Sequence, residues 1–478
     1  MKKSLSRILL VLLCVVLLAG FPACTNNNPS SSDPGSGDSS QTDDPFVPAN
    51  KVISVSWFVP WWMSESDYDY IFEEFERKYP GYTIEHNALD DLPTLLAAIQ
   101  AGNQPDVWMG GDPNNTNFIS GCFQSLFKNL DDYLTRDPIV NFNTLDKNQM
   151  ELTKFSGGHY ALPYLTTQFC MVYNKTLFER AGYSKPPETW SELEAYARKL
   201  TIADSNGKLT QLGIVNGPYQ YELENGGNRS GSLKENGIDS NMDSDWILKV
   251  NQFCEKVYDI ADKSTKPEDV DFQLTKGNAA INFEGNLNVL NDYVAAGIDI
   301  GLARYPRADE DSAQNIPSLL WNYFAIPNGA KNPDGGWLFA KFAMTDGIYQ
   351  TVARDYQKNP SGLFPQYIAH KDTREKVYNT LLGEVPDKIK ALIEERDKMV
   401  QGDDLYIIPY SPIHSTLKDI EQDWSSRKEA GEVNLKEKLL GVHNEYTETL
   451  SIWKKTMENQ GWQFPEGAAA IPPEGYGK

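Results

Sequence analysis

The chain has 478 residues, 66 of them acidic and 44 basic, which gives a formal net charge of −22 at pH 7. This length is too great for one hydrophobic core and predicts about two or three domains or lobes. The acidic balance argues against a nucleic acid or an anionic membrane surface as partner, and its simplest consequence is high solubility.

The N-terminus has the pattern of a bacterial secretion signal. Three basic residues precede an apolar run at residues 8–18, which is too short for a transmembrane helix. Residues 18–24, LAGFPAC, resemble the lipobox of bacterial lipoproteins, with an unusual Phe-Pro pair before the alanine. We therefore expect residues 1–23 to be a signal peptide and Cys24 to carry the lipid. The alternative is an ordinary secreted protein without lipid.

Residues 24–50 are rich in Ser, Asn, Asp, Gly and Pro and contain almost no large apolar side chains. A segment of this composition cannot bury enough apolar surface to fold, so we expect a disordered tether. With a lipid at its start, such a tether would hold the folded part of the protein near a membrane.

From residue 51 the chain alternates between the patterns of strands and helices. Val and Ile alternate with Ser in the first strand, and aromatic residues recur at helical spacing in the first helix. The expected elements are a strand at 52–57, a helix at 68–79, a strand at 82–86, a helix at 92–100 and a strand at 106–109. Repeated β-α-β units predict a parallel sheet.

A capped helix is expected to begin after Thr189. Thr189 stands at the N-cap and Glu192 at the third helical position, which is the pattern of a capping box. The apolar residues that follow recur at helical spacing down to Leu200 and predict one buried stripe. We expect Trp190 to pack in the core rather than to contact a ligand.

The stretch from residue 159 to 200 resembles a segment of the family 1 solute-binding proteins of bacterial ABC importers, which include maltodextrin and oligosaccharide binders. In that family the chain first crosses between two lobes here. The family's motifs appear as YALP at 160–163, YNKTLFERAG at 173–182 and PPETWSEL at 186–193. The resemblance covers roughly residues 51–455.

This resemblance implies an α/β fold of the type II periplasmic-binding-protein kind, the Venus flytrap. Each lobe would be a mixed, mostly parallel sheet flanked by helices, with a hinge between the lobes and the ligand in the cleft. We expect lobe one at 51–168 and 320–362, and lobe two at 169–319 and 363–478.

A sugar site needs aromatic plates for the C–H faces of the sugar and polar side chains for its hydroxyls. Trp57, Trp61 and Trp62 come at the end of the first strand, which should face the cleft. Three exposed tryptophans at a loop would be costly without a purpose, although any one of them could instead pack in the core.

The resemblance supplies the other candidates. Asp112 matches a hydroxyl-binding Asp of the maltodextrin-type members, with helix capping as the alternative, and Asn286 stands where the family often has a stacking Trp. Trp321 and Tyr323 are expected to supply that missing aromatic platform. The remaining candidates at positions that line the cleft in relatives are Thr167, Gln168, Tyr219, Glu284, Tyr410 and His414.

Neither a metal site nor a cofactor is expected. The five His residues are dispersed, and no Cys or His pair has zinc-like spacing. Cys122, Cys170 and Cys254 are expected to be buried free thiols, with one disulfide as the alternative. The sequence also lacks a nucleophile elbow, an H-E-x-x-H motif and a recognisable pair of catalytic carboxylates.

We therefore expect a monomeric lipoprotein that is not an enzyme. It would capture a carbohydrate, and specifically an oligosaccharide, between its lobes, close around it and dock on the permease of an ABC transporter. Two alternatives stay open: the same fold with a polyamine or peptide as ligand, and a secreted glycosidase.

Overall fold

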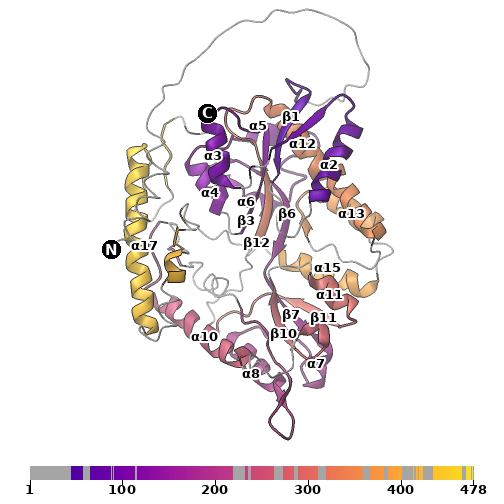
Figure 1. Cartoon of the computed structure of the whole chain (residues 1–478), viewed down its shortest axis with the longest axis vertical. Helices are drawn as coiled ribbons and strands as arrows, with labels where there is room; N and C mark the ends of the chain where they lie inside the picture. The colour runs from indigo at the N-terminus through magenta and orange to yellow at the C-terminus, as the bar shows by residue number, and fades with distance from the viewer. Residues whose placement is uncertain are drawn as a thin grey trace, which may run out of the picture.

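The larger of the two main sheets organises the upper lobe in Figure 1. The computed structural model describes residues 45–476 apart from 58–64, 88, 90, 114–115, 219–231, 235–237, 263–272, 285–288, 311–318, 359–365, 382–385, 401–412, 414–415, 418, 424–433, 466–469 and 475. Six strands lie in the order β13-β6-β12-β3-β1-β2. Their bounds are β1 Val52–Trp57, β2 Thr83–His86, β3 Val107–Pro113, β6 Leu162–Gln168, β12 Leu319–Ala325 and β13 Tyr367–Ile368.

The predicted parallel sheet is confirmed at one side of this sheet. β1 pairs in parallel with β2 and with β3, as repeated β-α-β units require. β12 runs antiparallel to both β3 and β6, and β13 runs antiparallel to β6, so the sheet is mixed. We call the part of the chain around this sheet lobe one.

Side-chain alternation builds two cores, one on each face of the larger sheet. Val107 and Met109 of β3 lie in one core, whereas Trp108 between them lies in the other. The first core holds α2 (Glu65–Lys78), α12 (Pro333–Phe342) and α13 (Ile348–Lys358), and the second holds α3 (Leu92–Gln100) and α4 (Thr116–Phe123). The shorter elements of lobe one are α5 (Asp131–Arg136), α6 (Lys147–Glu151), β4 (Lys154–Phe155), β5 (Gly158–His159), η3 (Ala343–Gly347) and α14 (Lys371–Thr380).

A smaller sheet organises lobe two in the same way. Its strands lie in the order β10-β7-β11, with bounds Ile281–Glu284, Cys170–Asn174 and Ile300–Ala303. Met171 and Tyr173 face α7 (Lys175–Arg180), α8 (Trp190–Leu200) and α10 (Asp245–Asp262), whereas Cys170 and Val172 face α11 (Leu290–Ala295) and α15 (Asp387–Val400). The further elements are β8 (Ile202–Ala203), β9 (Leu209–Gln211) and η1 (Leu274–Lys276).

The predicted capped helix is α8. The Thr189 hydroxyl accepts from the Glu192 backbone N–H at 3.3 Å, as expected of an N-cap. Glu192 Oε2 accepts instead from the backbone N–H of Glu188, one residue before the cap, at 2.7 Å. Trp190 is a core residue as predicted, because it stacks on Phe253 with ring centroids 4.6 Å apart.

Two expected boundaries differ from the structure. The tether was expected to reach residue 50, but Phe46 is buried against Tyr133 and Trp337 of lobe one, with ring centroids 4.4 and 6.0 Å away. Residues from 363 onward were expected in lobe two, but β13 joins the larger sheet and α14 packs beside it. The physical reason is backbone hydrogen bonding: the two-residue strand β13 pairs with β6 and so completes the edge of the larger sheet.

The long helix α17 (Leu435–Asn459) and the segment after it bring the end of the chain back to lobe one. Trp453 and Trp462 pack on Phe123, at 5.1 and 4.7 Å between ring centroids. The Tyr476 hydroxyl donates to the Cys122 carbonyl at 2.5 Å. α17 also contacts α10, so it lies along both lobes, as Figure 1 shows.

Candidate functional site

One edge of the larger sheet faces lobe two. β1, β3 and β6 run in the same direction, so their carboxyl ends meet at this edge together with the start of β12. In Figure 1, β6 runs from the upper lobe toward β7 and β10 of the lower one, and β12 runs back beside it in the opposite direction. Ligands of open α/β sheets bind at the carboxyl ends of the strands, which makes this edge the candidate site.

The strand register brings several predicted residues to that edge. Trp321 of β12 is opposite Asp112 of β3 on one side and Thr166 of β6 on the other. Leu319 is opposite Gln168, the last residue of β6. The backbones of Asp112, Gln168 and Trp321 therefore lie on neighbouring strands although they are far apart in the sequence.

Lobe two contributes its own edge directly across the first crossing. β7 begins at Cys170, two residues after β6 ends, and Glu284 at the end of β10 is opposite Cys170. Glu284 is thus the last residue of a strand that ends where the two lobes meet. This placement is shared with Thr167, which stands three residues before Cys170.

Thr167 has an unused hydroxyl. Its Oγ1 is buried, and in the described part of the chain it has no hydrogen-bond partner. The hydroxyl of the neighbouring Thr166 is instead bonded to Gln149 Oε1 of α6. A buried polar group without a partner is costly, and a bound hydroxyl would relieve that cost at Thr167.

Glu284 is held by a polar network at the end of β10. Tyr293 of α11 donates its hydroxyl to Glu284 Oε1 at 2.5 Å, and the Asn282 amide also donates to Oε1. Asn216 donates to Asn282 Oδ1 at 2.8 Å. Burial raises the pKa of the Glu284 carboxyl above its usual value, whereas the hydrogen bond from Tyr293 opposes that rise. The network fixes an oriented oxygen acceptor at the inter-lobe edge.

Tyr293, Asn282 and Asn216 were missed by the sequence prediction. Asn282 and Glu284 are two residues apart in one strand, so they project from the same face, and this spacing was a usable signal. Tyr293 and Asn216 come from other elements, and only the tertiary structure brings them to Glu284.

Two predicted site residues are wrong. Trp57 is fully buried in the core of lobe one, where Phe72, Tyr164, Phe324 and Phe339 surround its ring at 5.4–6.1 Å. Tyr323 is also fully buried, on the opposite face of the sheet, against Trp108 and Phe118. Strand alternation turns both rings into the cores and away from the edge.

The other predictions for the site lie beyond what the structure describes. The side chains of Asp112, Gln168 and Trp321 are not described, although their backbones are. The residues wholly outside the described part are Cys24, Trp61, Trp62, Tyr219, Asn286, Tyr410 and His414.

Cys122, Cys170 and Cys254 are buried thiols that form no disulfide, as expected. Within the described ranges, no group of three or more His, Cys, Asp or Glu residues could hold a metal ion. No helix of that same part is long and apolar enough to cross a membrane.

A second contact between the lobes lies at α15. This helix packs on β11 of lobe two, yet its Arg396 donates to the Gln366 carbonyl before β13 at 2.8 Å and to the Tyr378 hydroxyl of α14 at 2.5 Å. Arg396 is buried and is also paired with its neighbour Asp397 at 2.6 Å. The lobes are therefore joined by a buried cation as well as by the chain.

Comparison with known proteins gives a consistent picture. The family model of bacterial extracellular solute-binding proteins matches residues 62–350. The maltotriose-binding protein of Pyrococcus abyssi (strain GE5 / Orsay) is 24% identical over 291 residues, which cover 57% of this chain and 58% of that protein. The sn-glycerol-3-phosphate-binding periplasmic protein UgpB of Salmonella paratyphi A is 24% identical over 293 residues, which cover 54% and 63%.

The match thus spans less than two thirds of the length of these two relatives. Among solved structures, the sugar-binding protein MalE of Xanthomonas citri matches 85% of this chain and 99% of its own, with a TM-score of 0.66 at 16% identity. That likeness shows the fold: the two-lobed α/β architecture predicted from the sequence is confirmed.

Proposed function

Because the chain belongs to the bacterial extracellular solute-binding proteins, we propose that it captures an oligosaccharide between its lobes and delivers it to the permease of an ABC transporter. The observation that carries the proposal is the pair of Thr167 and Glu284. One offers an unused hydroxyl and the other a fixed carboxylate, on the two sides of the first crossing.

Each member of this pair suits a sugar hydroxyl. A threonine hydroxyl both donates and accepts, and an ionised carboxylate accepts two or more hydrogen bonds. Because the residues belong to different lobes, only a closed form would use both at once. Ligand binding would therefore shift the protein toward closure.

Aromatic surface for the sugar faces would come from residues whose side chains are not described. We propose Trp61, Trp62 and Trp321 for that role, with Asp112 and Gln168 as further hydroxyl partners. Tyr219, Asn286, Tyr410 and His414 remain proposals on the same resemblance. Trp321 has the best support, because its backbone is opposite Asp112 at the inter-lobe edge.

A phosphorylated polyol is the second candidate, because one relative is named as a binder of sn-glycerol 3-phosphate. The carboxylate of Glu284 opposes it, since a like charge close to a phosphate raises its free energy in the site. Maltotriose, for which another relative is named, carries no charge, so it would bind beside Thr167 and Glu284 without that penalty.

We also propose that Cys24 carries a lipid after removal of residues 1–23, which would keep the receptor at the outer face of a membrane. Because β13 and α14 pack with the larger sheet, we propose a revised division into lobes. Lobe one would hold 51–168, 320–362 and the segment through α14, and lobe two would hold 169–319 and α15.

Calorimetric titration with maltotriose, mannotriose and sn-glycerol 3-phosphate tests the proposed ligand class. We expect saturable binding of at least one oligosaccharide and about tenfold weaker binding after Glu284→Gln, which removes a charge-assisted hydrogen bond. Glu194→Gln is the matched control, because that carboxylate lies on the surface of α8 and pairs with Arg198. Binding of sn-glycerol 3-phosphate without binding of either oligosaccharide would reject the assignment. An oligosaccharide affinity of the Glu284 variant equal to that of the native chain would also reject it.

A further inference from the structure

A rigid loop at the far end of lobe one exposes two large apolar side chains. The loop follows α5 and spans residues 137–144. Ile139 is 49% exposed and Phe142 is 41% exposed, and Phe142 rests on the ring of His159 at 5.0 Å. We call these two side chains the apolar tip.

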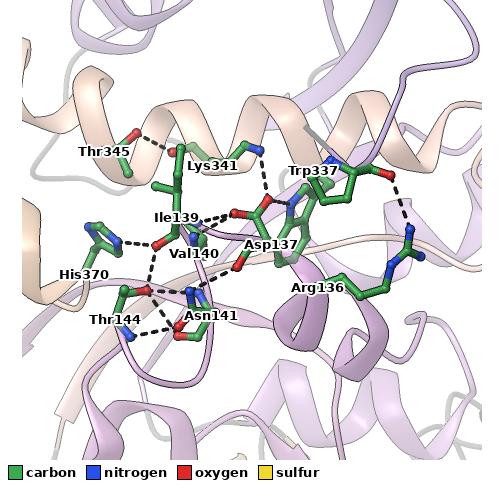
Figure 2. A network of polar contacts seen from close by, with 11 residues as sticks. Arg136, Asp137, Ile139, Val140, Asn141, Thr144, Trp337, Lys341, Thr345 and His370 are labelled. Atoms are coloured by element: carbon green, nitrogen blue, oxygen red, sulfur yellow. Dashed lines mark hydrogen bonds and ion pairs between the residues drawn. The ribbon is translucent and has the colours of Figure 1, made fainter. Parts of the chain in front are cut away.

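The loop is fixed from inside by Asp137 (Figure 2). Asp137 Oδ1 accepts from the backbone N–H groups of Ile139 and Val140 at 2.8 and 2.9 Å. Its Oδ2 accepts from Lys341 Nζ and Trp337 Nε1 of α12 at 2.8 and 2.7 Å. The base of the loop is therefore part of the buried structure of lobe one.

The loop is also fixed from the side of α14. His370 Nε2 donates to the Ile139 carbonyl at 3.0 Å, and the Lys371 backbone N–H donates to the Thr144 carbonyl at 2.8 Å. Within the loop, the Thr144 hydroxyl donates to the same Ile139 carbonyl at 2.7 Å. A loop held in this way cannot fold its apolar side chains inward, so the tip stays exposed at a cost.

The tip lies at the end of lobe one that is remote from the inter-lobe edge. β13 runs antiparallel to β6, so His370, just after β13, lies near the start of β6 and not near its end at the edge. The start of β1 and α5 are at this same end, at the top of Figure 1. Of the large apolar side chains exposed in the described part of the chain, Val47 and Val52 also belong to this end.

The N-terminal chain leaves the folded body beside the tip. Arg136, the residue before the loop, lies over the ring of Phe46 at 4.7 Å and donates to the Pro45 carbonyl at 3.4 Å. From Cys24 to Pro45 there are about 20 residues, which reach at most about 70 Å. A lipid on Cys24 would thus confine this end of lobe one to the neighbourhood of the bilayer.

We propose that the apolar tip docks on the lipid bilayer that holds the anchor, so that this end of lobe one rests on the membrane while the receptor is not engaged with a permease. This inference rests on the lipid anchor of the proposed function. Confinement by the tether raises the effective concentration of the tip at the surface, so a weak contact suffices. Arg136 is paired with Asp132, so the contact is apolar and does not depend on anionic lipid.

Fluorescent labelling of the full-length chain, purified with its lipid and reconstituted in phosphatidylcholine vesicles, tests the docking. A polarity-sensitive dye is attached at Phe142→Cys, and the buried native thiols Cys122, Cys170 and Cys254 leave that position selectively reactive. Leu440→Cys is the matched control, because Leu440 is also a large exposed apolar residue, on α17. Quenchers carried on the lipid tails report contact with the bilayer.

We expect the dye at position 142 to shift to the blue and to lose at least about half of its emission to lipid-borne quencher. The dye at position 440 should remain unaffected, and Ile139→Ser should reduce quenching at position 142. Equal quenching at the two positions, or none at either, would overturn the docking if mass spectrometry finds lipid on Cys24. A Cys24 without lipid would remove the basis of the docking, whereas sugar binding by calorimetry would stand apart from both results.

Discussion

The buried pair of Asp137 and Lys341 offers a sharp test of how lobe one is held together. Lys341→Met removes the cation and keeps a side chain of similar length that suits a helix. The two side chains are 0% and 5% exposed, and Nζ lies 2.8 Å from Oδ2 (Figure 2). Without Lys341, the carboxylate keeps one indole and two backbone donors but stays buried without a counter-ion.

Removing one partner of a buried pair costs about 3–5 kcal/mol. We expect about 3 kcal/mol for Lys341→Met, because the three remaining donors still stabilise the anion. Burial would by itself raise the pKa of Asp137, but the hydrogen bonds from Lys341 and Trp337 lower it. The variant should therefore also raise that pKa, so that its loss of stability relative to the native chain is greatest near neutral pH and becomes smaller as acid protonates Asp137.

Urea unfolding followed by hydrogen exchange in α12 and α5 measures this loss within lobe one, since a two-lobed chain need not unfold in one step. Lys78→Met is the matched control: its partner Asp346 lies 2.5 Å away, but both side chains are more than 40% exposed. We expect less than about 1 kcal/mol there. A Lys341 variant as stable as the Lys78 variant would refute the view that this pair is a buried support of the lobe.

Three further predictions concern other contacts. Burial lowers the pKa of His370, so the unfolded state takes up the proton first and stability falls as the pH drops below about 6.5; thermal melts of His370→Gln between pH 7 and 5 should lose part of this dependence. Phe46→Ala should lower the free energy of unfolding by about 3 kcal/mol and expose the Pro45 region to proteolysis. An unchanged cleavage pattern would contradict the view that Phe46 holds this segment on lobe one. Arg396→Met should loosen the contact between lobes, and solution scattering that shows the native radius of gyration would count against that contact.

Local patterns in the sequence were sufficient for the individual elements. Strand alternation and helical spacing predicted β1, α2 and α3, and the cap at Thr189 predicted the start of α8. These features depend on residues within one or two turns of each other, so an isolated segment already contains the information. The motifs from residue 159 to 200 also placed the first crossing between lobes.

Burial at the ends of strands was not determined by local pattern. Trp57 is followed by two more tryptophans, and no local pattern distinguishes a core-facing tryptophan among the three. The rings of Phe72, Tyr164, Phe324 and Phe339 that enclose Trp57 come from four separate elements. The same is true of Tyr323, whose neighbours belong to β3 and α4.

The sequence by itself determined the order of strands and helices, the acidic net charge and the family resemblance, because composition and short-range spacing carry these properties. Only the tertiary structure decided that Tyr293 orients Glu284, that Lys341 of α12 holds Asp137 at the base of an exposed loop and that β13 belongs to lobe one. Each of these contacts joins groups from separate elements, and its free energy depends on a burial and a distance that exist only after the chain has folded.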